Sequence, residues 1–344
     1  MMRKSLIWLV LVVVMLAGAG VVAENLIVGE LRRLEAQGQA FSAERIDTLP
    51  QPLRIGAHVT SPVAAISNGA VRLDSADLWI EPLSPFTARI GLPGKATIEQ
   101  PDGMHELTFD PPSVTARFQP LAGLAPGEVN VATSNLVLDG APFAQSANIA
   151  ANAVPVDPSA PASSQAGYDV NWKLEGLDPK ALPVLASLTG ALEPEDRISF
   201  EGQGRFWLDK VPTPRAMAAL PSPMMTGLRF DRAELHVGAL SARVLGRLDA
   251  DAQGRAQGAL AIYTSDAIPM LDAAAEAGMI PKRAVPLAQA MMRRVSAMPV
   301  ALSDQAGAAV PDAAKGELRL PLTFAEGRMS LGPIPLGAAP RLRP

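Results

Sequence analysis

Cysteine is absent from this chain, histidine occurs only three times, and aromatic residues make up 4 % of its 344 residues. Without cysteine, no disulfide can staple the fold and no thiol can carry the lipid of a lipoprotein. Stability must therefore come from a large core or an extended sheet. Because hydrophobic residues reach 48 % while aromatic residues are scarce, aliphatic side chains must fill that interior.

Charge is also sparse. Charged residues make up 19 % of the sequence, and the formal net charge is −4. Surfaces that bind nucleic acid need an excess of basic residues to neutralise phosphates. We therefore expect no nucleic-acid partner.

Residue patterns that carry chemistry are equally scarce. The histidines, His58, His105 and His236, lie in or beside strand-like segments without a second ligand at helical spacing, so we expect solvated or edge residues. The chain has no Gly-x-Ser-x-Gly elbow, no Gly-x-Gly-x-x-Gly and no Walker phosphate loop. We predict that the protein is not an enzyme, with no catalytic residues, no metal site and no cofactor.

Two acidic segments resemble sites only in part. Residues 249–254 begin like a calcium loop, but Gln253 and Leu260 occupy positions where that loop needs ligands. We predict a hairpin turn there instead. The carboxylates of residues 193–196 lie in a proline-containing connector, where we expect them to be solvated.

Residues 6–23 form a long uncharged apolar run that follows the basic residues Arg3 and Lys4. Signal peptides and membrane anchors share this pattern, and the positive-inside rule leaves Arg3 and Lys4 in the cytoplasm. As a helix, the run would measure about 27 Å, close to the roughly 30 Å hydrocarbon core of a bilayer. Cleavage after Ala23 and retention both fit.

We predict retention, because apolar residues recur at helical spacing from residue 26 to residue 34. Residues 1–23 are then a transmembrane anchor or uncleaved signal segment, and residues 24–40 a helical stalk. The expected location is the inner membrane, crossed once through residues 6–23, with the C-terminal body in the periplasm. A soluble periplasmic protein after cleavage is the alternative.

Residues 41–153 are predicted to form a first sheet-rich region. In the segment 76–80, Ala76, Leu78 and Ile80 alternate with Asp77 and Trp79, which is the period-two pattern of a strand with one buried face. Turn signals at short intervals favour antiparallel hairpins between short strands over strand–helix–strand units. These signals are Pro82, Pro85, Pro93-Gly94, Pro101-Asp102-Gly103 and Pro111-Pro112.

Residues 154–167 are rich in proline, serine and alanine and poor in large apolar side chains. This composition is typical of a surface linker between two sheet-rich regions. A long loop inside one continuous curved sheet is an equally good interpretation.

Residues 168–344 are predicted to form a second sheet-rich region with covering helices. In one strand Phe200, Gly202, Gly204 and Phe206 share a face, and the two glycines leave room for a close neighbour. Alternation predicts the other strands at 228–237, 240–248 and 256–264, and a closing hairpin at 318–331.

The hydrophobic period changes to 3.6 after Ser265. Leu287, Met291, Val295 and Met298 recur at helical spacing and are expected to face a sheet. The predicted helices that cap or cover the sheet lie at about 25–38, 179–189, 267–277 and 283–298.

The C-terminal part resembles a known family. Segment 322–337, which reads LTFAEGRMSLGPIPLG, looks like the ending of the family named domain of unknown function 2125 (DUF2125). The strands at 232–235 and 240–248, the Asp-Gln-Gly turn and the strand that ends at Tyr263 resemble that family in order and spacing. The resemblance implies no catalytic residues. It implies a membrane helix followed by an extracytoplasmic sheet-rich body, which is similar to AsmA-like envelope proteins implicated in lipid movement.

We therefore expect an α+β, mostly β fold, in which an N-terminal membrane helix precedes curved antiparallel sheets with a few covering helices. Two functions stay open. One is binding or transfer of lipid or acyl chains on a concave sheet face. The other is a non-enzymatic envelope scaffold or protein-interaction module without a ligand. A ligand groove requires apolar strand faces that are larger than the area the helices cover. In a scaffold without a ligand, every apolar face is covered by another part of the chain.

Overall fold

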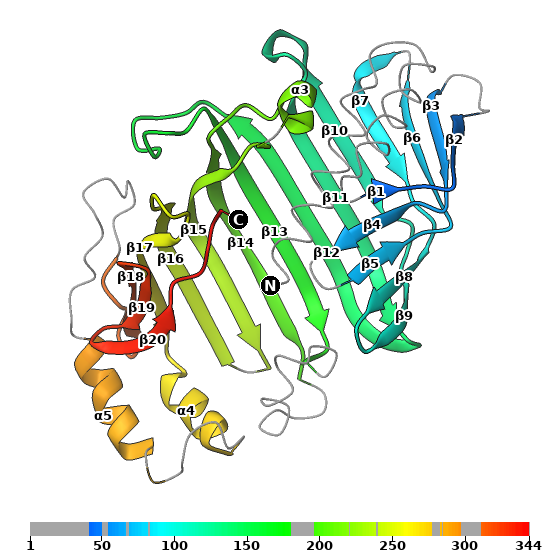
Figure 1. Ribbon diagram of the computed structural model, residues 1–344. Helices are drawn as coiled ribbons and strands as arrows, with labels where there is room; N and C mark the ends of the chain where they lie inside the picture. The colour runs from blue at the N-terminus through cyan, green and yellow to red at the C-terminus, as the bar shows by residue number, and fades with distance from the viewer. Residues whose placement is uncertain are drawn as a thin grey trace. The chain divides into compact units, whose positions relative to one another are not determined.

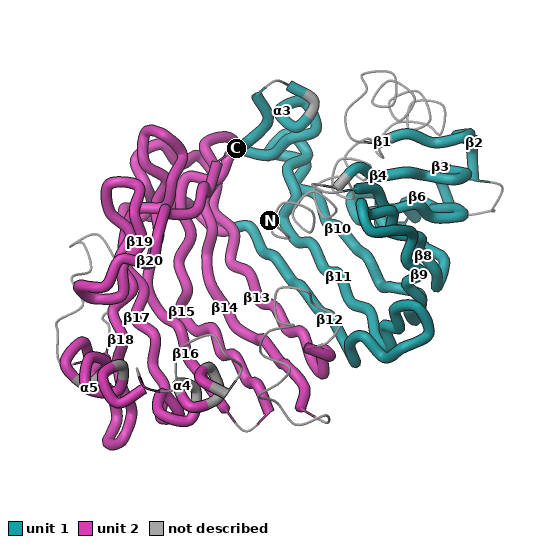
Figure 2. The backbone as a smooth tube through the Cα atoms, turned by 60° about the horizontal axis from the view of Figure 1, so that its bottom comes forward, with its two compact units in different colours: residues 1–153, 211–223 teal, residues 154–210, 224–344 magenta. Residues whose placement is uncertain are grey.

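The chain divides into two units, which Figure 2 shows in different colours. Unit 1 comprises residues 1–153 and 211–223, and unit 2 comprises residues 154–210 and 224–344. The computed structural model describes residues 41–49, 54–66, 69–81, 83–179, 196–219, 221–238, 240–276, 283, 285–296 and 311–343. No helix within these ranges is long and apolar enough to cross a membrane.

Three predicted segments fall outside the described residues. They are the membrane segment at 6–23, the stalk helix at 25–38, and all but the first residue of the helix at 179–189. The mostly β, antiparallel character of the fold is confirmed, because every strand pairing within each unit is antiparallel.

Unit 1 is built on an antiparallel sheet in which most strands are bent in the middle (Figure 1). The first ten strands are β1 (Phe41–Ser42), β2 (Arg45–Thr48), β3 (Ile55–Thr60), β4 (Val63–Ile66), β5 (Gly69–Arg72), β6 (Ser75–Glu81), β7 (Ser84–Gly91), β8 (Lys95–Gln100), β9 (Gly103–Thr108) and β10 (Ser113–Gln119). Two successive elements are the two halves of one bent strand. The halves are β1 and β2, β3 and β4, β5 and β6, β7 and β8, and β9 and β10. Backbone hydrogen bonds continue through the bends: the Ser61 N–H donates to the Asp74 carbonyl (2.9 Å).

The bends create two limbs. One limb has the order β2-β3-β6-β7-β10, and the other β1-β4-β5-β8-β9. Both limbs pair with β11 (Ala125–Leu138), β10 along its first part and β9 at its end. The other edge of β11 pairs with β12 (Ala141–Val154). Strands that bend from one sheet into another are how corners form in orthogonal sheet packing.

Two of the predicted turns are corners instead. Pro101–Gly103 forms the hairpin turn between β8 and β9, as predicted, whereas Pro93-Gly94 and Pro111-Pro112 lie in the bends. Proline lacks a backbone donor, so it fits an interrupted strand as well as a turn. The expectation of short strands is also wrong for β11 and β12, which span 14 residues each.

The core of unit 1 lies on one face of the first limb. Its buried members are Ile46, Ala57, Val59, Leu78, Ile80, Ala88, Ile90, Val114, Ala116, Phe118 and Val129. The alternation predicted for segment 76–80 is confirmed, because Leu78 and Ile80 are buried in this core. Trp79 lies on the other face, where the Arg54 guanidinium sits 4.6 Å from its ring centre.

Unit 2 is a meander in which each strand pairs with the next along the chain. Its strands are β13 (Ala166–Leu177), β14 (Ile198–Leu208), β15 (Met225–Val237), β16 (Leu240–Ala250), β17 (Ala256–Thr264), β18 (Leu318–Ala325), β19 (Arg328–Leu331) and β20 (Ile334–Ala338). The strands predicted at 228–237, 240–248 and 256–264 and the hairpin at 318–331 are confirmed. The sequence pattern did not predict β20.

The helices α4 (Ala267–Glu276) and α5 (Val285–Ser296) lie between β17 and β18, where helices were predicted. A short helix that the pattern does not predict, α3 (Pro214–Ala218), belongs to unit 1. The expected buried face of α5 is wrong for two of its members. Val295 is buried, but Leu287 is 65 % exposed and Met291 38 % exposed, while Met298 lies outside the described residues. The helix contacts α4 and β18, and Leu287 and Met291 are not part of its buried side.

We expect Gly202→Ala to destabilise unit 2 by about 1–3 kcal/mol. A Cβ at Gly202 would lie 2.3 Å from the Arg232 carbonyl oxygen and 2.6 Å from the Trp172 ring. The backbone of the neighbouring strand can move away only by disturbing its hydrogen bonds with β14. In the control Gly127→Ala, the three atoms nearest to the new Cβ all belong to the Gln119 side chain, the closest at 2.9 Å, and this side chain can rotate. Urea unfolding measures the free energy of unfolding of both variants. Hydrogen exchange then shows which unit has lost stability. Equal effects of the two substitutions would contradict the close packing at Gly202.

Candidate functional site

The cross-strand register of unit 2 gathers apolar side chains on one face of its sheet, which we call the apolar face. Its members lie opposite one another in rows, such as Tyr168, Phe206, Leu228 and Leu248. The apolar face comprises Tyr168, Val170, Trp172, Leu174, Phe200, Phe206, Leu228, Phe230, Leu235, Val244, Leu248, Leu260, Ile262, Leu320, Leu322 and Phe324.

One end of the apolar face is covered by the C-terminal segment. Ala339 and Leu342 belong to the same cluster as the buried side chains of Leu248, Leu260 and Phe324. Backbone hydrogen bonds hold the segment in place, because the Ala256 N–H donates to the Pro340 carbonyl (2.8 Å) and the Leu342 N–H to the Gly254 carbonyl (2.8 Å).

Most of the rest of the apolar face is only half-buried, although Tyr168 and Leu320 on it are buried. We call the half-buried part away from the C-terminal segment the open patch; it comprises Val170, Trp172, Leu174, Phe200, Phe230, Leu235, Val244 and Ile262. The core face of unit 1 is different, because Val59, Leu78 and Val114 there are almost fully buried. Large apolar side chains that stay partly exposed side by side are typical of surfaces that receive a ligand or partner.

Three aromatic rings form the centre of the open patch. The Trp172 ring lies 5.6 Å from the Phe200 ring and 6.0 Å from the Phe230 ring, the latter edge to face. Trp172 can lie flat on the sheet because Gly202 has no side chain beneath it, which confirms the close approach predicted for that glycine. The Trp172 Nε1 is buried and has no hydrogen-bond partner among the described residues. An unpaired buried donor is costly, so an acceptor that reached this N–H would stabilise the site.

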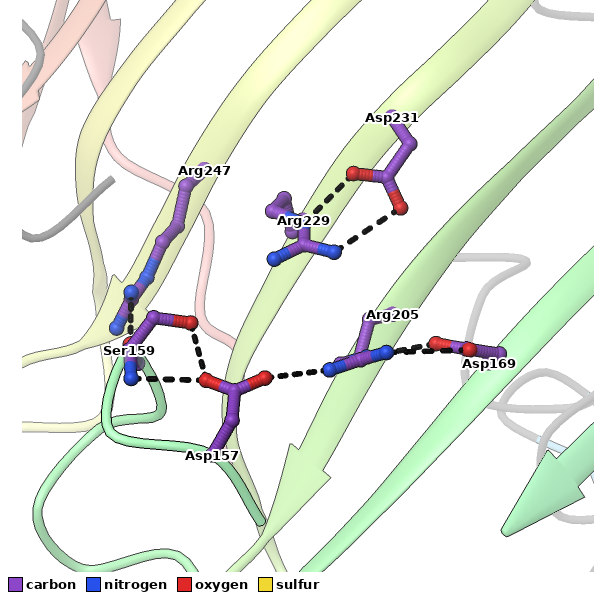
Figure 3. A network of polar contacts seen from close by, with 7 residues as sticks. All are labelled: Asp157, Ser159, Asp169, Arg205, Arg229, Asp231 and Arg247. Carbon is purple, nitrogen blue, oxygen red and sulfur yellow. Dashed lines mark hydrogen bonds and ion pairs between the residues drawn. The ribbon is translucent and has the colours of Figure 1, made fainter. Parts of the chain in front are cut away.

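The opposite face of the same sheet carries a row of three arginines, which we call the arginine row. Arg205, Arg229 and Arg247 lie directly opposite one another on β14, β15 and β16 (Figure 3). Like charges in register repel one another, so each guanidinium needs a carboxylate. Arg205 binds Asp169 with both Nε (2.6 Å) and Nη2 (3.1 Å).

The other two arginines are paired within their own strands. The Arg229 Nε donates to Asp231 (2.6 Å), and Arg247 donates to both oxygens of Asp249 (2.7 and 2.8 Å). The Arg247 and Arg229 guanidiniums also lie 5.0 and 5.9 Å from the ring centre of the buried Trp207. Arg247 is only 4 % exposed, which is tolerable only because its charge is paired and hydrogen-bonded.

The loop of residues 155–165, between β12 and β13, is fastened to the arginine row. Asp157 accepts a hydrogen bond from the Arg205 Nη1 (2.5 Å), and the Ser159 carbonyl accepts one from the Arg247 Nη1 (Figure 3). Farther along, the Ser164 hydroxyl lies 2.7 Å from the Thr226 hydroxyl. The proline-, serine- and alanine-rich segment is thus a bound loop on unit 2.

Asp157 is the residue that joins the loop to the sheet. Besides Arg205, its carboxylate accepts hydrogen bonds from the Ser159 hydroxyl and the Ser159 N–H (2.8 Å). These contacts, with the Ser159 hydroxyl as the largest cause, lower the pKa of Asp157 below its ordinary value. Each arginine of the row is bound to at least one carboxylate, from Asp157, Asp169, Asp231 or Asp249, which makes the row a structural network rather than an open anion site.

The three histidines are each paired with a carboxylate on the sheet surface. His58 lies 2.6 Å from Asp77 on the next strand, His105 lies 2.7 Å from Asp139, and His236 lies 3.8 Å from Glu234. The hydrogen bond with Asp139 raises the pKa of His105. The structure does not bring the histidines together, and in the described residues no group of histidine, aspartate and glutamate could hold a metal ion.

The calcium-like segment 249–254 is a turn, as predicted, and joins β16 to β17. Asp251 accepts hydrogen bonds from the backbone N–H groups of Gln253 (2.9 Å) and Arg255 (2.8 Å), and Asp249 is bound to Arg247. Of the carboxylates predicted at 193–196, only Asp196 is described, beside the start of β14.

The arginine row was not predicted from the sequence. The signal for it is the local pattern of an arginine followed two residues later by an aspartate, at Arg229 and Asp231 and again at Arg247 and Asp249. Residues two apart share a strand face, so the pairs are readable, but the alignment of three strands is not.

We expect the loop 155–165 to open as the pH falls. The folded-state pKa of Asp157 is lowered, so its pairing stabilises the loop above its ordinary pKa of about 4, and the contribution is lost as the pH falls through the lowered value. Hydrogen exchange at the Ser159 amide, corrected for intrinsic rates, follows the opening. Asp157→Ala should show the same loss at neutral pH, whereas Asp272→Ala, at an exposed position on α4, should not. A loop equally protected in Asp157→Ala would refute this role.

No curated protein and no solved structure matches the chain, so the similarity to AsmA-like proteins stays a prediction. Residues 20–340 match the family described as "Uncharacterized protein conserved in bacteria (DUF2125)". Because that match covers nearly the whole sequence, the chain belongs to the DUF2125 family.

Proposed function

We propose that this protein binds a lipid or acyl chain on the open patch of unit 2 and works in the bacterial cell envelope, held to the inner membrane by residues 6–23. The proposal contains no catalytic step. The observation that supports it is the difference in burial between the two units. Apolar side chains such as Val59, Leu78 and Val114 are almost fully buried in the core of unit 1, whereas those of the open patch are half-buried.

The chemistry of the open patch fits an acyl chain. Ligand sites for apolar molecules combine a hydrophobic lining with very few polar groups that fix orientation. The open patch supplies branched aliphatic side chains such as Val170 and Leu235 and three aromatic rings. Its buried polar donor without a described partner is the Trp172 Nε1, which could donate to an ester or carboxyl oxygen at the head of the chain.

The topology proposed for residues 6–23 agrees with such a ligand. A membrane anchor keeps the binding face near the source of lipids and raises the local concentration of the ligand. The anchor rests on the sequence pattern alone, and its cleavage would leave a soluble periplasmic carrier with the same open patch.

We expect Val170→Glu to abolish lipid binding at the open patch, because a carboxylate on an apolar surface must be desolvated when an acyl chain covers it. The full chain, purified in mild detergent, is incubated with a phospholipid that carries a photoactivatable diazirine in its acyl chain. After irradiation, labelled peptides are mapped by mass spectrometry. In the unmodified chain, label should appear in β13, β14 and β15. Val170→Glu should lower that label several-fold.

Asn171→Glu is the matched control, since Asn171 is exposed on the opposite face one residue away. It should leave the label in β13 to β15 unchanged. Labelling of residues 6–23 serves as an internal reference for lipid exposure. Label confined to residues 6–23, or equal loss in both variants, would refute lipid binding and favour the envelope scaffold without a ligand.

A further inference from the structure

The side of α5 that faces solvent is apolar. Among the described side chains of residues 283–296, the exposed ones are those of Arg283, Pro286, Leu287, Ala290, Met291 and Arg294, and we call them the α5 surface. Leu287 and Met291 are the large apolar side chains among them, 65 % and 38 % exposed. The solvent side of a helix on a globular protein is normally polar, so an apolar one indicates a contact that the chain does not make with itself.

Helical spacing places these residues on one stripe. Leu287, Met291 and Arg294 stand at i, i+4 and i+7, which share a face. The packing side of α5 is a different one, because Val295 is buried and Met292 and Ser296 are half-buried. The helix lies beside α4 and contacts β18 (Figure 1), and Leu287 and Met291 stay exposed in spite of these contacts. The exposed apolar stripe is therefore separate from the side of α5 that packs in the core.

The charges of the segment 283–296 itself have one sign. Arg283 precedes the helix, Arg294 lies in its last turn, and α5 itself contains no acidic residue. This stands out in a chain whose net charge is −4. Helices that lie in a membrane surface combine an apolar stripe with basic residues beside it, and long basic side chains reach the phosphate groups while their stems stay in the apolar layer.

We propose that the α5 surface docks on an anionic lipid bilayer. Leu287 and Met291 enter the boundary between headgroups and acyl chains, and Arg283 and Arg294 bind lipid phosphates at the two ends. A protein partner could cover the same apolar stripe, but basic residues at both ends and no acid between them match a uniformly negative surface best. The inference does not depend on lipid binding by the open patch.

The absence of cysteine makes a direct test available. Leu287→Cys in the full chain is labelled with the environment-sensitive fluorophore NBD and combined with vesicles during detergent removal. In vesicles of phosphatidylglycerol and phosphatidylcholine in equal parts, we expect a several-fold rise in NBD emission, a blue shift, and quenching by brominated acyl chains. Phosphatidylcholine alone should give a much smaller rise, and high salt should reduce the difference.

Gln253→Cys is the matched control, because Gln253 is exposed in the turn at the other end of β17 from α4. It should show no bromine quenching in either vesicle. Adding Arg283→Glu and Arg294→Glu to the Leu287→Cys chain should remove the preference for phosphatidylglycerol. Emission at residue 287 that matches residue 253 in both vesicles would overturn the proposal. A rise that follows protein concentration and not lipid composition would also overturn it, in favour of contact with a second chain.

Discussion

The strand register of unit 2 is the constraint on which its other features depend. Side chains alternate across a strand, so a slip of one residue would move every apolar side chain to the opposite face. In the observed register Trp172 lies opposite Gly202, and Arg205 lies opposite Arg229. The same pairing therefore builds the open patch on one face and the arginine row on the other. Gly202 helps to hold that register, because only a residue without a side chain leaves room for the Trp172 ring on the strand beside it.

The arginine row then explains why the loop 155–165 is ordered. Three guanidiniums in register on adjacent strands repel one another unless acceptors separate them. The strands supply Asp169, Asp231 and Asp249, and the loop supplies the Asp157 carboxylate and the Ser159 carbonyl. A composition poor in large apolar residues cannot pack a core, so polar contacts are the means by which such a segment is fixed. The loop in turn shields Arg247, whose burial would otherwise leave a charge without full hydrogen bonding.

The parts of this fold that sequence could predict are those in which one local pattern has one structural meaning. Alternation in β17 and β18 has a single reading, and the strands lie where it predicts. Proline has several readings, and Pro93 and Pro111 mark corners within bent strands where the pattern predicts turns. For α5 the period gives the helix but not its orientation, since an apolar stripe can face either a sheet or an outside surface. The candidate site follows the same rule: β14 to β17 and the glycines of β14 could be predicted, whereas β13 was missed and the exposure of the open patch depends on which parts of the chain pack over it.

The positions of the open patch and the α5 surface within unit 2 connect the two proposals. The C-terminal segment covers the end of the apolar face near the turn at 251–255, while the row of Leu174, Phe200 and Leu235 lies near the strand end from which the chain enters α4. Both α4 and α5 lie beyond that end of the strands (Figure 1). A bilayer in contact with α5 would therefore lie closer to the open end of the apolar face than to its covered end. An acyl chain leaving the membrane would then meet the row of Leu174, Phe200 and Leu235 first and the Trp172 and Phe230 rings after it, without crossing the polar face that carries the arginine row.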